Sequence, residues 1–246
     1  MDTTVAGWHP DPSGRHEWRH WDGRWWTDHV ADGGVTTLDP LPPADTQQQA
    51  AQPADHIVVD AEVKAGLKGG RRIVVTDRAF HDGGVSFPFA EVTALNHCKT
   101  RMTTSGQGTL NNVYEVWLAM GKGKPTRIYW SGAGPHEQQV FNAVVEALHR
   151  FLAPRLVAEM VKRIAAGETI EISGLLVSAD GVARKKLIGG GSGPVVPWSV
   201  PVRVEPEEGF YTVIAETGGK PDRIAAVPVK ALNAALVHPL LHAFTG

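Results

Sequence analysis

Five of the eight tryptophans lie within the first 26 residues of the chain, at Trp8, Trp18, Trp21, Trp25 and Trp26. A segment this short cannot bury five indole rings in its own core, because chains below about 40 residues rarely fold without staples or unusually dense aromatic packing. Some rings must pack the segment, and others remain as a contact surface. The chain therefore begins with a module typical of recognition.

A hairpin is predicted inside this module, because Asp22-Gly23 separates two aromatic-rich runs at 16–21 and 24–30. Asp-Gly suits a two-residue turn, which requires positive φ at both positions. Alternation along the first strand then places one set of side chains on an open face. The candidate binding residues are His16, Trp18 and His20 on this face, together with Trp8.

The remaining rings are expected to pack against the turn Pro10-Asp11-Pro12. Contacts between tryptophan and proline are the simplest core available at this size. The expected packing set is Trp8, Trp21 and either Trp25 or Trp26.

The spacing of these residues resembles a short Trp-rich domain of unknown function that is common in actinobacterial proteins. That domain has the pattern Gly-Trp-Tyr-Pro-Asp-Pro, then Trp-Asp-Gly, then Trp-Thr. This chain matches it over residues 6–31, with His9 in place of the tyrosine. A looser similarity to WW domains implies binding of a proline-rich peptide in an aromatic groove.

Residues 32–55 are predicted to form a flexible linker, because Pro, Gln, Ala and Asp follow one another there without periodicity. Within it, Leu41-Pro42-Pro43 is either a stiff spacer or a polyproline ligand. This division gives a Trp-rich module over 1–31, followed by the linker.

An internal repeat is predicted beyond the linker, with copies at 56–166 and 167–246. Each copy holds strand-like runs, a turn, a Pro-centred strand, a glycine-rich hairpin and a closing helix. The expected closing helices cover 135–152 and 229–244, and an additional helix is expected over 155–166.

The two copies align on short matching segments. Phe87-Pro88-Phe89 corresponds to Val196-Pro197-Trp198, and Arg127-Ile128 to Arg223-Ile224. We therefore expect Phe89 and Trp198 to be equivalent buried residues that start a central strand. The arrangement resembles the bacterial pleckstrin-homology-like fold, which implies a bent β-barrel closed by a helix in each copy. The expected fold class is α+β, mainly β.

Charge and composition exclude several functions. Residues 1–55 carry three basic and nine acidic side chains, and the whole chain has a net charge of −2, so nucleic-acid binding is not expected. No apolar run reaches the length of a membrane span, and no secretory signal is expected. The single cysteine, Cys98, suits a reducing cytoplasm, which is the expected location, with membrane association as an alternative.

No catalytic or cofactor motif is present in the sequence, so neither an enzyme nor a cofactor is expected. The glycine run 189–193 lacks the Gly-Lys-Ser/Thr ending of a phosphate loop. Cys98 and His97 are neighbours whose side chains point to opposite faces of a strand. The histidines of the N-terminal module have no cysteine beside them, so a metal site is not expected. An enzyme without a recognisable motif remains an alternative.

Basic loops offer a second kind of site. Arg184, Lys185 and Lys186 are the candidates for contact with anionic lipid headgroups, and solubilising loop tips are the alternative interpretation. The sequence thus favours a non-enzymatic binding or scaffold protein, whose Trp-rich module contacts a protein or peptide. A peripheral membrane protein is the second hypothesis.

Overall fold

The computed structural model describes residues 6–22, 26–39, 55–64, 69–103, 110–186 and 191–245. The chain forms two compact units, residues 1–55 and residues 56–246, and each is considered by itself.

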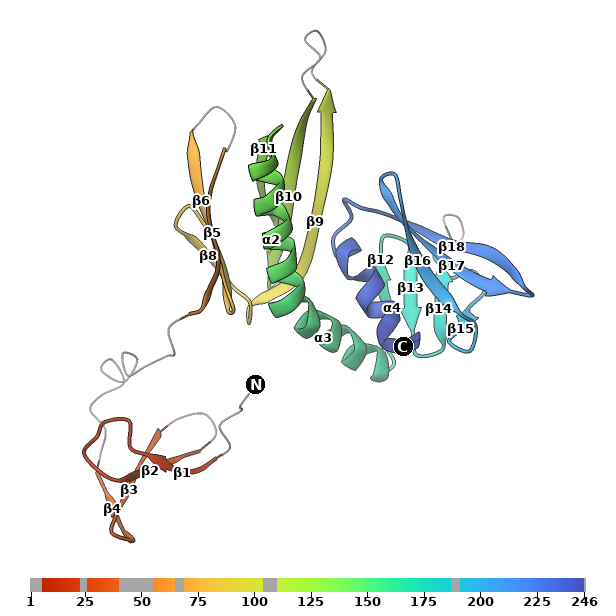
Figure 1. Ribbon diagram of the computed structural model, residues 1–246. Helices are drawn as coiled ribbons and strands as arrows, with labels where there is room; N and C mark the ends of the chain where they lie inside the picture. Colours follow the sequence, from red (N-terminus) through yellow and green to blue (C-terminus); the bar gives the residue numbers. More distant parts are fainter. Residues whose placement is uncertain are drawn as a thin grey trace. The chain divides into compact units, whose positions relative to one another are not determined.

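The first unit is a four-stranded antiparallel sheet in sequence order (Figure 1). Its strands are β1 (Gly7–Pro10), β2 (Trp18–Trp21), β3 (Trp26–Asp32) and β4 (Val35–Leu38). Asp32 pairs with Val35, so Gly33-Gly34 forms the tight turn, with φ of 54° and 85°. Glycine adopts both of these values without strain.

Two boundaries of this unit differ from the sequence prediction. Trp21 pairs with Trp26, so the connection between β2 and β3 holds four residues instead of the Asp22-Gly23 pair alone. The module also continues past residue 31, because β4 lies in the range expected to be a linker and pairs with β3. Leu41-Pro42-Pro43 falls outside the described residues.

The second unit begins with two antiparallel sheets and a helix. The first sheet contains β5 (Ile57–Lys64), β6 (Gly70–Thr76), β7 (Ala79–Asp82) and β8 (Val85–Pro88). The second contains β9 (Val92–Thr103), β10 (Leu110–Met120) and β11 (Thr126–Gly132). Helix α2 (Pro135–Phe151) follows, and its apolar residues recur at helical spacing. Helix α3 (Ala153–Ala165) then leads into the second half of the unit.

The second half repeats this order of elements. A four-stranded sheet contains β12 (Ile170–Ile172), β13 (Leu175–Ser178), β14 (Gly181–Arg184) and β15 (Val196–Pro197). A three-stranded sheet contains β16 (Val202–Glu207), β17 (Phe210–Thr217) and β18 (Lys220–Pro228). The 3₁₀ turn η2 (Ala234–Leu236) and helix α4 (Val237–Thr245) close the chain.

The aligned prolines occupy matching turns. The Glu91 amide donates to the Pro88 carbonyl and the Val200 amide to the Pro197 carbonyl, both at 3.0 Å. Phe89 and Trp198 therefore lie in turns between sheets. The prediction that each starts a central strand is wrong. Phe89 is buried, whereas Trp198 is half-buried and stacks on Phe244 with ring centroids 4.6 Å apart.

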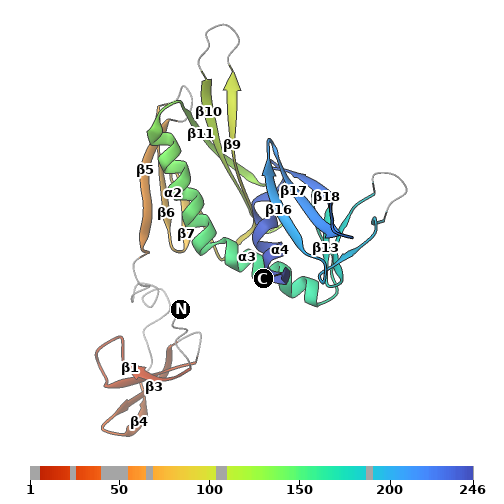
Figure 2. The same ribbon diagram turned by 45° about the vertical axis from the view of Figure 1, so that its right-hand side comes forward.

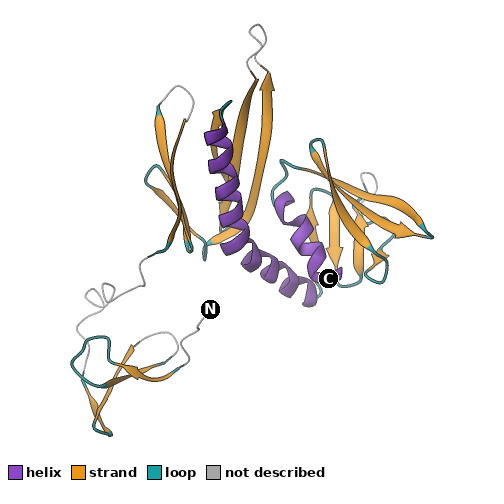
Figure 3. Cartoon of the chain, in the orientation of Figure 1, coloured by secondary structure: helices purple, strands orange, loops and turns teal. Residues whose placement is uncertain are grey.

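The expected closed barrels are not found among the described strands. Figure 3 shows separate sheets with α2 running along them. β5 and β11 are in contact but share no strand pairing, and α2 packs on both. Side-chain burial, instead of a continuous hydrogen-bonded ladder, thus joins the sheets. The described chain is mainly β, with five antiparallel sheets and three α-helices.

One continuous core joins the two halves of the second unit. Asn96 is fully buried on β9, and its side-chain amide donates to the Val229 carbonyl at 2.9 Å. Asn233 donates its amide to the Leu95 carbonyl, at 3.0 Å. Asn233 has a φ of 65°, outside the helical region, so the helix expected over 229–244 begins only at Val237. The preceding segment instead covers the edge of β9.

Candidate binding surfaces

A buried ion pair occupies the interior of the N-terminal unit. The Arg19 Nε donates to Asp11 Oδ1 at 2.9 Å, and both side chains are inaccessible to solvent. Val30 is the only fully buried apolar residue that the structure describes in this unit. Because a buried charge is costly unless it is paired and hydrogen-bonded, we expect the loss of either partner to destabilise the unit.

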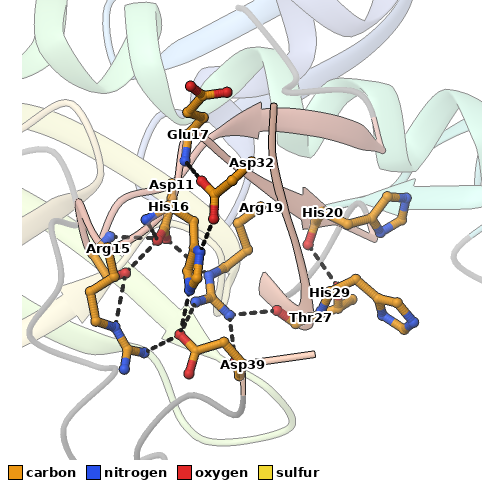
Figure 4. Close-up of polar contacts among 11 residues, drawn as sticks. Asp11, Arg15, His16, Glu17, Arg19, His20, Thr27, His29, Asp32 and Asp39 are labelled. Atoms are coloured by element: carbon orange, nitrogen blue, oxygen red, sulfur yellow. Dashed lines mark hydrogen bonds and ion pairs between the residues drawn. The ribbon is translucent and has the colours of Figure 1, made fainter. Parts of the chain in front are cut away.

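The rest of the Arg19 guanidinium is also satisfied, as Figure 4 shows. It donates to the backbone carbonyls of Thr27 and Asp39, each at 3.0 Å, and to the Asp39 carboxylate at 3.1 Å. Burial alone would raise the pKa of the Asp11 carboxyl, but hydrogen bonds from Ser13 and Arg19 outweigh it and lower that pKa. Arg19 thus ties the first turn to the end of β4.

His16 belongs to this polar framework and not to the open aromatic face. Its Nδ1 lies 2.5 Å from Asp32 Oδ2, and its Nε2 lies 3.2 Å from Asp39 Oδ2. The hydrogen bond to Asp32 raises the pKa of His16. The sequence had grouped His16 with Trp18 and His20, but residue 16 precedes β2 and does not share the alternation of that strand.

Two tryptophans share the open face of the sheet. Trp8 pairs with His20 and Pro10 pairs with Trp18 across β1 and β2, and directly opposed residues point to the same side. Trp8 is 41% exposed and Trp18 is 45% exposed. The rings of Trp8 and His20 meet edge to face, with centroids 5.4 Å apart. The structure thus brings together three of the four candidate residues.

The opposite face holds the packing aromatics. Trp21 meets Trp26 edge to face at 5.2 Å, and His9 meets Trp26 at 6.1 Å. Trp8 therefore does not belong to the packing set in which the sequence analysis also placed it. The turn at Pro10-Asp11-Pro12 contributes its aspartate to Arg19, a role that the sequence analysis missed. The order Asp-Pro-Ser is typical of a turn in which the aspartate side chain accepts a hydrogen bond from the backbone two residues later. This pattern could have indicated a structural role for Asp11.

A basic groove lies in the second half of the larger unit. Arg184 ends β14 and is followed by Lys185 and Lys186, and these three residues line a cavity of 520 Å³ together with Arg223 from β18. Arg223 was not among the sequence candidates, because only the packing of β18 beside β14 brings it to this position. An adjoining cavity of 470 Å³ shares Arg184, Lys185 and Arg223 and reaches the turn at Ser173.

Acidic side chains neutralise part of this groove. Lys185 Nζ lies 2.7 Å from Glu171, and Arg223 lies 3.2 Å from Glu207. Arg184 and Lys186 form no ion pair within the described part of the chain. Two cations thus remain free to meet an anionic ligand.

Two histidines meet at the junction of β9 and α2. The Nε2 atoms of His97 and His149 lie 2.8 Å apart, so one ring must be neutral and accept the hydrogen bond. Burial, together with the smaller effect of the neighbouring His149, lowers the pKa of His97 to about 4. The Cys98 thiol points elsewhere and donates to Glu115 at 3.1 Å. Burial is the larger cause and Glu115 the smaller one, and together they raise the pKa of the Cys98 thiol to about 12.

The His97 pKa predicts acid sensitivity of residues 56–246. His97 stays neutral in the folded protein until pH falls to about 4, but it takes up a proton near its ordinary value of 6.5 once unfolded. Its stabilising contribution is therefore complete above pH 6.5 and is lost as pH falls toward 4, a loss of up to about 3 kcal/mol. The free energy of unfolding, measured with urea between pH 7 and pH 4, should fall less steeply for His97→Asn than for the natural chain. His56 is exposed, so His56→Asn should show the same fall as the natural chain.

No group of three or more His, Cys, Asp or Glu side chains within the described ranges is arranged to hold a metal ion. None of the described helices is both long and apolar enough to cross a membrane.

These features define a mainly β protein with an aromatic module, a basic groove and a histidine junction. Residues 6–54 match the family model of a protein of unknown function, DUF2510. The match includes the whole described sheet of the first unit and extends past residue 31. No curated protein matches the chain.

Proposed function

We propose that this chain is a non-enzymatic binding protein whose N-terminal sheet holds an extended peptide on its open aromatic face. The observation that carries the proposal is the exposure of Trp8 and Trp18 on one side of a sheet whose interior is closed by Arg19 and Asp11. The fold does not need these two rings to fill its core. Exposed aromatic residues with polar neighbours are common at binding sites.

The chemistry of this face suits a peptide. Trp8 and Trp18 flank Pro10 and His20, which gives an apolar surface with one ring able to donate or accept a hydrogen bond. Aromatic surfaces of this kind hold extended, proline-containing segments, which lose little entropy on binding. In the same proposal, the two halves of residues 56–246 are pleckstrin-like modules that serve as a platform.

The proposal is tested by comparing Trp18→Ala with Trp21→Ala in the full chain. Trp18→Ala should leave the melting temperature of the first unit unchanged and weaken binding of peptides selected from a random ten-residue library at least tenfold. Trp21→Ala removes a ring that packs on Trp26, so it should melt the unit. Intact binding by Trp18→Ala, or melting of that variant, would show that the ring is structural.

A second function is favoured by the basic groove. We infer that Arg184 and Lys186, which lack acidic partners among the described residues, attract anionic lipid headgroups at a membrane surface. Each basic side chain near such a surface contributes about 1 kcal/mol, and salt weakens the attraction. Partial neutralisation of Lys185 and Arg223 limits the effect to a weak, peripheral contact.

Vesicle flotation tests this second function. The natural chain should float with vesicles of phosphatidylcholine and phosphatidylserine, but not with phosphatidylcholine alone. Replacing Arg184 and Lys186 by glutamine should weaken binding about 30-fold, since two charges contribute about 2 kcal/mol. The matched control replaces Lys122 and Lys124, which are exposed on another hairpin. Equal losses in the two double variants would indicate a general charge effect and contradict a specific groove.

A further inference from the structure

We propose that the free edge of β9 binds an extended, acidic peptide as an additional antiparallel strand. Strand β9 is at the end of its sheet, which has the order β11-β10-β9. Figures 1 and 2 show it as the outermost strand of the sheet, on the side facing the second half of the same unit. An edge strand has unpaired backbone groups that another chain can use.

The first part of this edge is already covered by the protein itself. The Leu95 amide donates to the Asn233 side chain at 3.1 Å, and the Leu95 carbonyl accepts from the Asn233 amide at 3.0 Å. Both backbone groups of Leu95 therefore point away from β10. Asn233 satisfies them as a neighbouring strand would.

The next outward-pointing groups have no such cover. Backbone groups two residues apart in a strand point to the same side, and the register of β9 with β10 is unbroken from Ala94 to Thr103. His97, Lys99 and Arg101 therefore direct their amides and carbonyls to the same free edge as Leu95. Within the part of the chain that the structure describes, no hydrogen bond reaches these backbone groups from that side.

A groove runs along this stretch and has room for a strand. Its volume is 870 Å³, with residues 97–101 of β9 on one side and residues 207–211 at the β16–β17 turn on the other. Phe210 in this wall is 40% exposed, and Phe141 of α2 contributes to the lining. The walls therefore come from both halves of the unit, which share one core.

The charge of the groove selects an acidic occupant. Lys99, Arg101 and Lys230 line it, and none of them forms an ion pair with a described residue. Of the two acidic residues in the lining, Glu207 is already engaged by Arg223, which leaves Glu208. Three cations thus face one unpaired carboxylate.

The two faces of the added strand would meet different surroundings. The side chains of His97 and Lys99 contact α2, through His149 and Gln138 respectively. Tyr211 and Cys98 line the groove as well, and the Cys98 side chain points to the opposite face of β9 from the side chains of His97 and Lys99. Acidic side chains of the peptide would lie beside Lys99, and the alternate apolar ones would lie toward Tyr211.

The test uses the full chain and two labelled octapeptides, one alternating glutamate with valine and the other alternating lysine with valine. The glutamate peptide should bind at least tenfold more tightly in fluorescence anisotropy, and added salt should reduce the difference. Failure of both peptides to bind, or equal binding of the two, would overturn the proposal.

Two variants at one position separate the backbone contact from the charge. Proline at 99 removes an amide that β10 does not use, so Lys99→Pro should fold and lose binding of the glutamate peptide. Lys99→Ala keeps the amide and should weaken binding only in part. Equal affinity of the two variants would contradict an added strand.

Amide exchange in the natural chain gives a readout that needs no variant. The glutamate peptide should slow exchange at His97, Lys99 and Arg101 and leave Cys98 and Thr100, which already face β10, unchanged. Uniform protection or none would overturn the proposal. The protein concentration is also raised without peptide. If the same alternating protection then appears, the edge binds a second copy of the chain instead of an acidic peptide. Loss of tryptophan-face binding in Trp18→Ala should leave this result unaffected.

Discussion

Arg19→Met should unfold the N-terminal unit while residues 56–246 stay folded. The substitution leaves the Asp11 carboxylate buried without its cation, and breaking a buried pair from one side costs about 3–5 kcal/mol. A unit of this size has only a few kcal/mol of stability. The methionine side chain approximates the volume of arginine but donates no hydrogen bonds to Thr27 or Asp39. Amide spectra of the full chain should lose the dispersed signals of residues 6–39 alone.

Two further variants identify the cause. Arg15→Met removes an arginine that is about half exposed and pairs with Asp39 at 2.9 Å, so it should cost less than about 1 kcal/mol. Adding Asp11→Asn to Arg19→Met removes the buried carboxylate charge that has lost its arginine. The asparagine oxygen still accepts hydrogen bonds from Ser13 and His16. This double variant should recover part of the lost stability. A normally folded Arg19→Met protein would mean that the buried pair does not support the fold.

Gly181→Ala should destabilise residues 56–246 by about 2–5 kcal/mol, the combined effect of backbone strain and overpacking. Gly181 begins β14 with a φ of 146°, and a Cβ there would lie 2.0 Å from the carbonyl oxygen of Val196. This obstacle is backbone of the adjacent strand, so it cannot move aside as a flexible side chain would. The midpoint of urea unfolding should fall with an unchanged slope.

Gly70→Ala is the matched control for this substitution. Gly70 also begins a strand, but its φ is ordinary and the nearest atom to an added Cβ is a side-chain oxygen of Glu62 at 3.7 Å. The change should shift stability by no more than about 0.5 kcal/mol. If both variants unfold at the same urea concentration, β14 and β15 must separate readily, and the close approach at Gly181 has no energetic consequence.

The candidate sites followed from the sequence only where neighbours along the chain are also neighbours in space. Arg184, Lys185 and Lys186 are consecutive, so their shared groove could be anticipated, whereas Arg223 reaches it through the packing of β18 beside β14. Alternation correctly grouped Trp18 with His20. It failed for His16, which precedes the strand and turns toward Asp32 and Asp39.

Local patterns determined the elements of this protein: the glycine-rich hairpins, the amphipathic spacing of α2 and the repetition around Pro88 and Pro197. These depend on φ preferences and on side-chain periodicity, which neighbouring residues set among themselves. Only the tertiary structure decided that Arg19 is buried, because that requires Asp11 and Asp39 from both ends of the module. Likewise the helix expected from Val229 is delayed to Val237, because Asn233 in the intervening segment satisfies both backbone groups of Leu95 on β9, 138 positions earlier in the chain. Such long-range hydrogen bonds outweigh a local helical preference, since a buried backbone group left unpaired costs more than a turn of helix contributes.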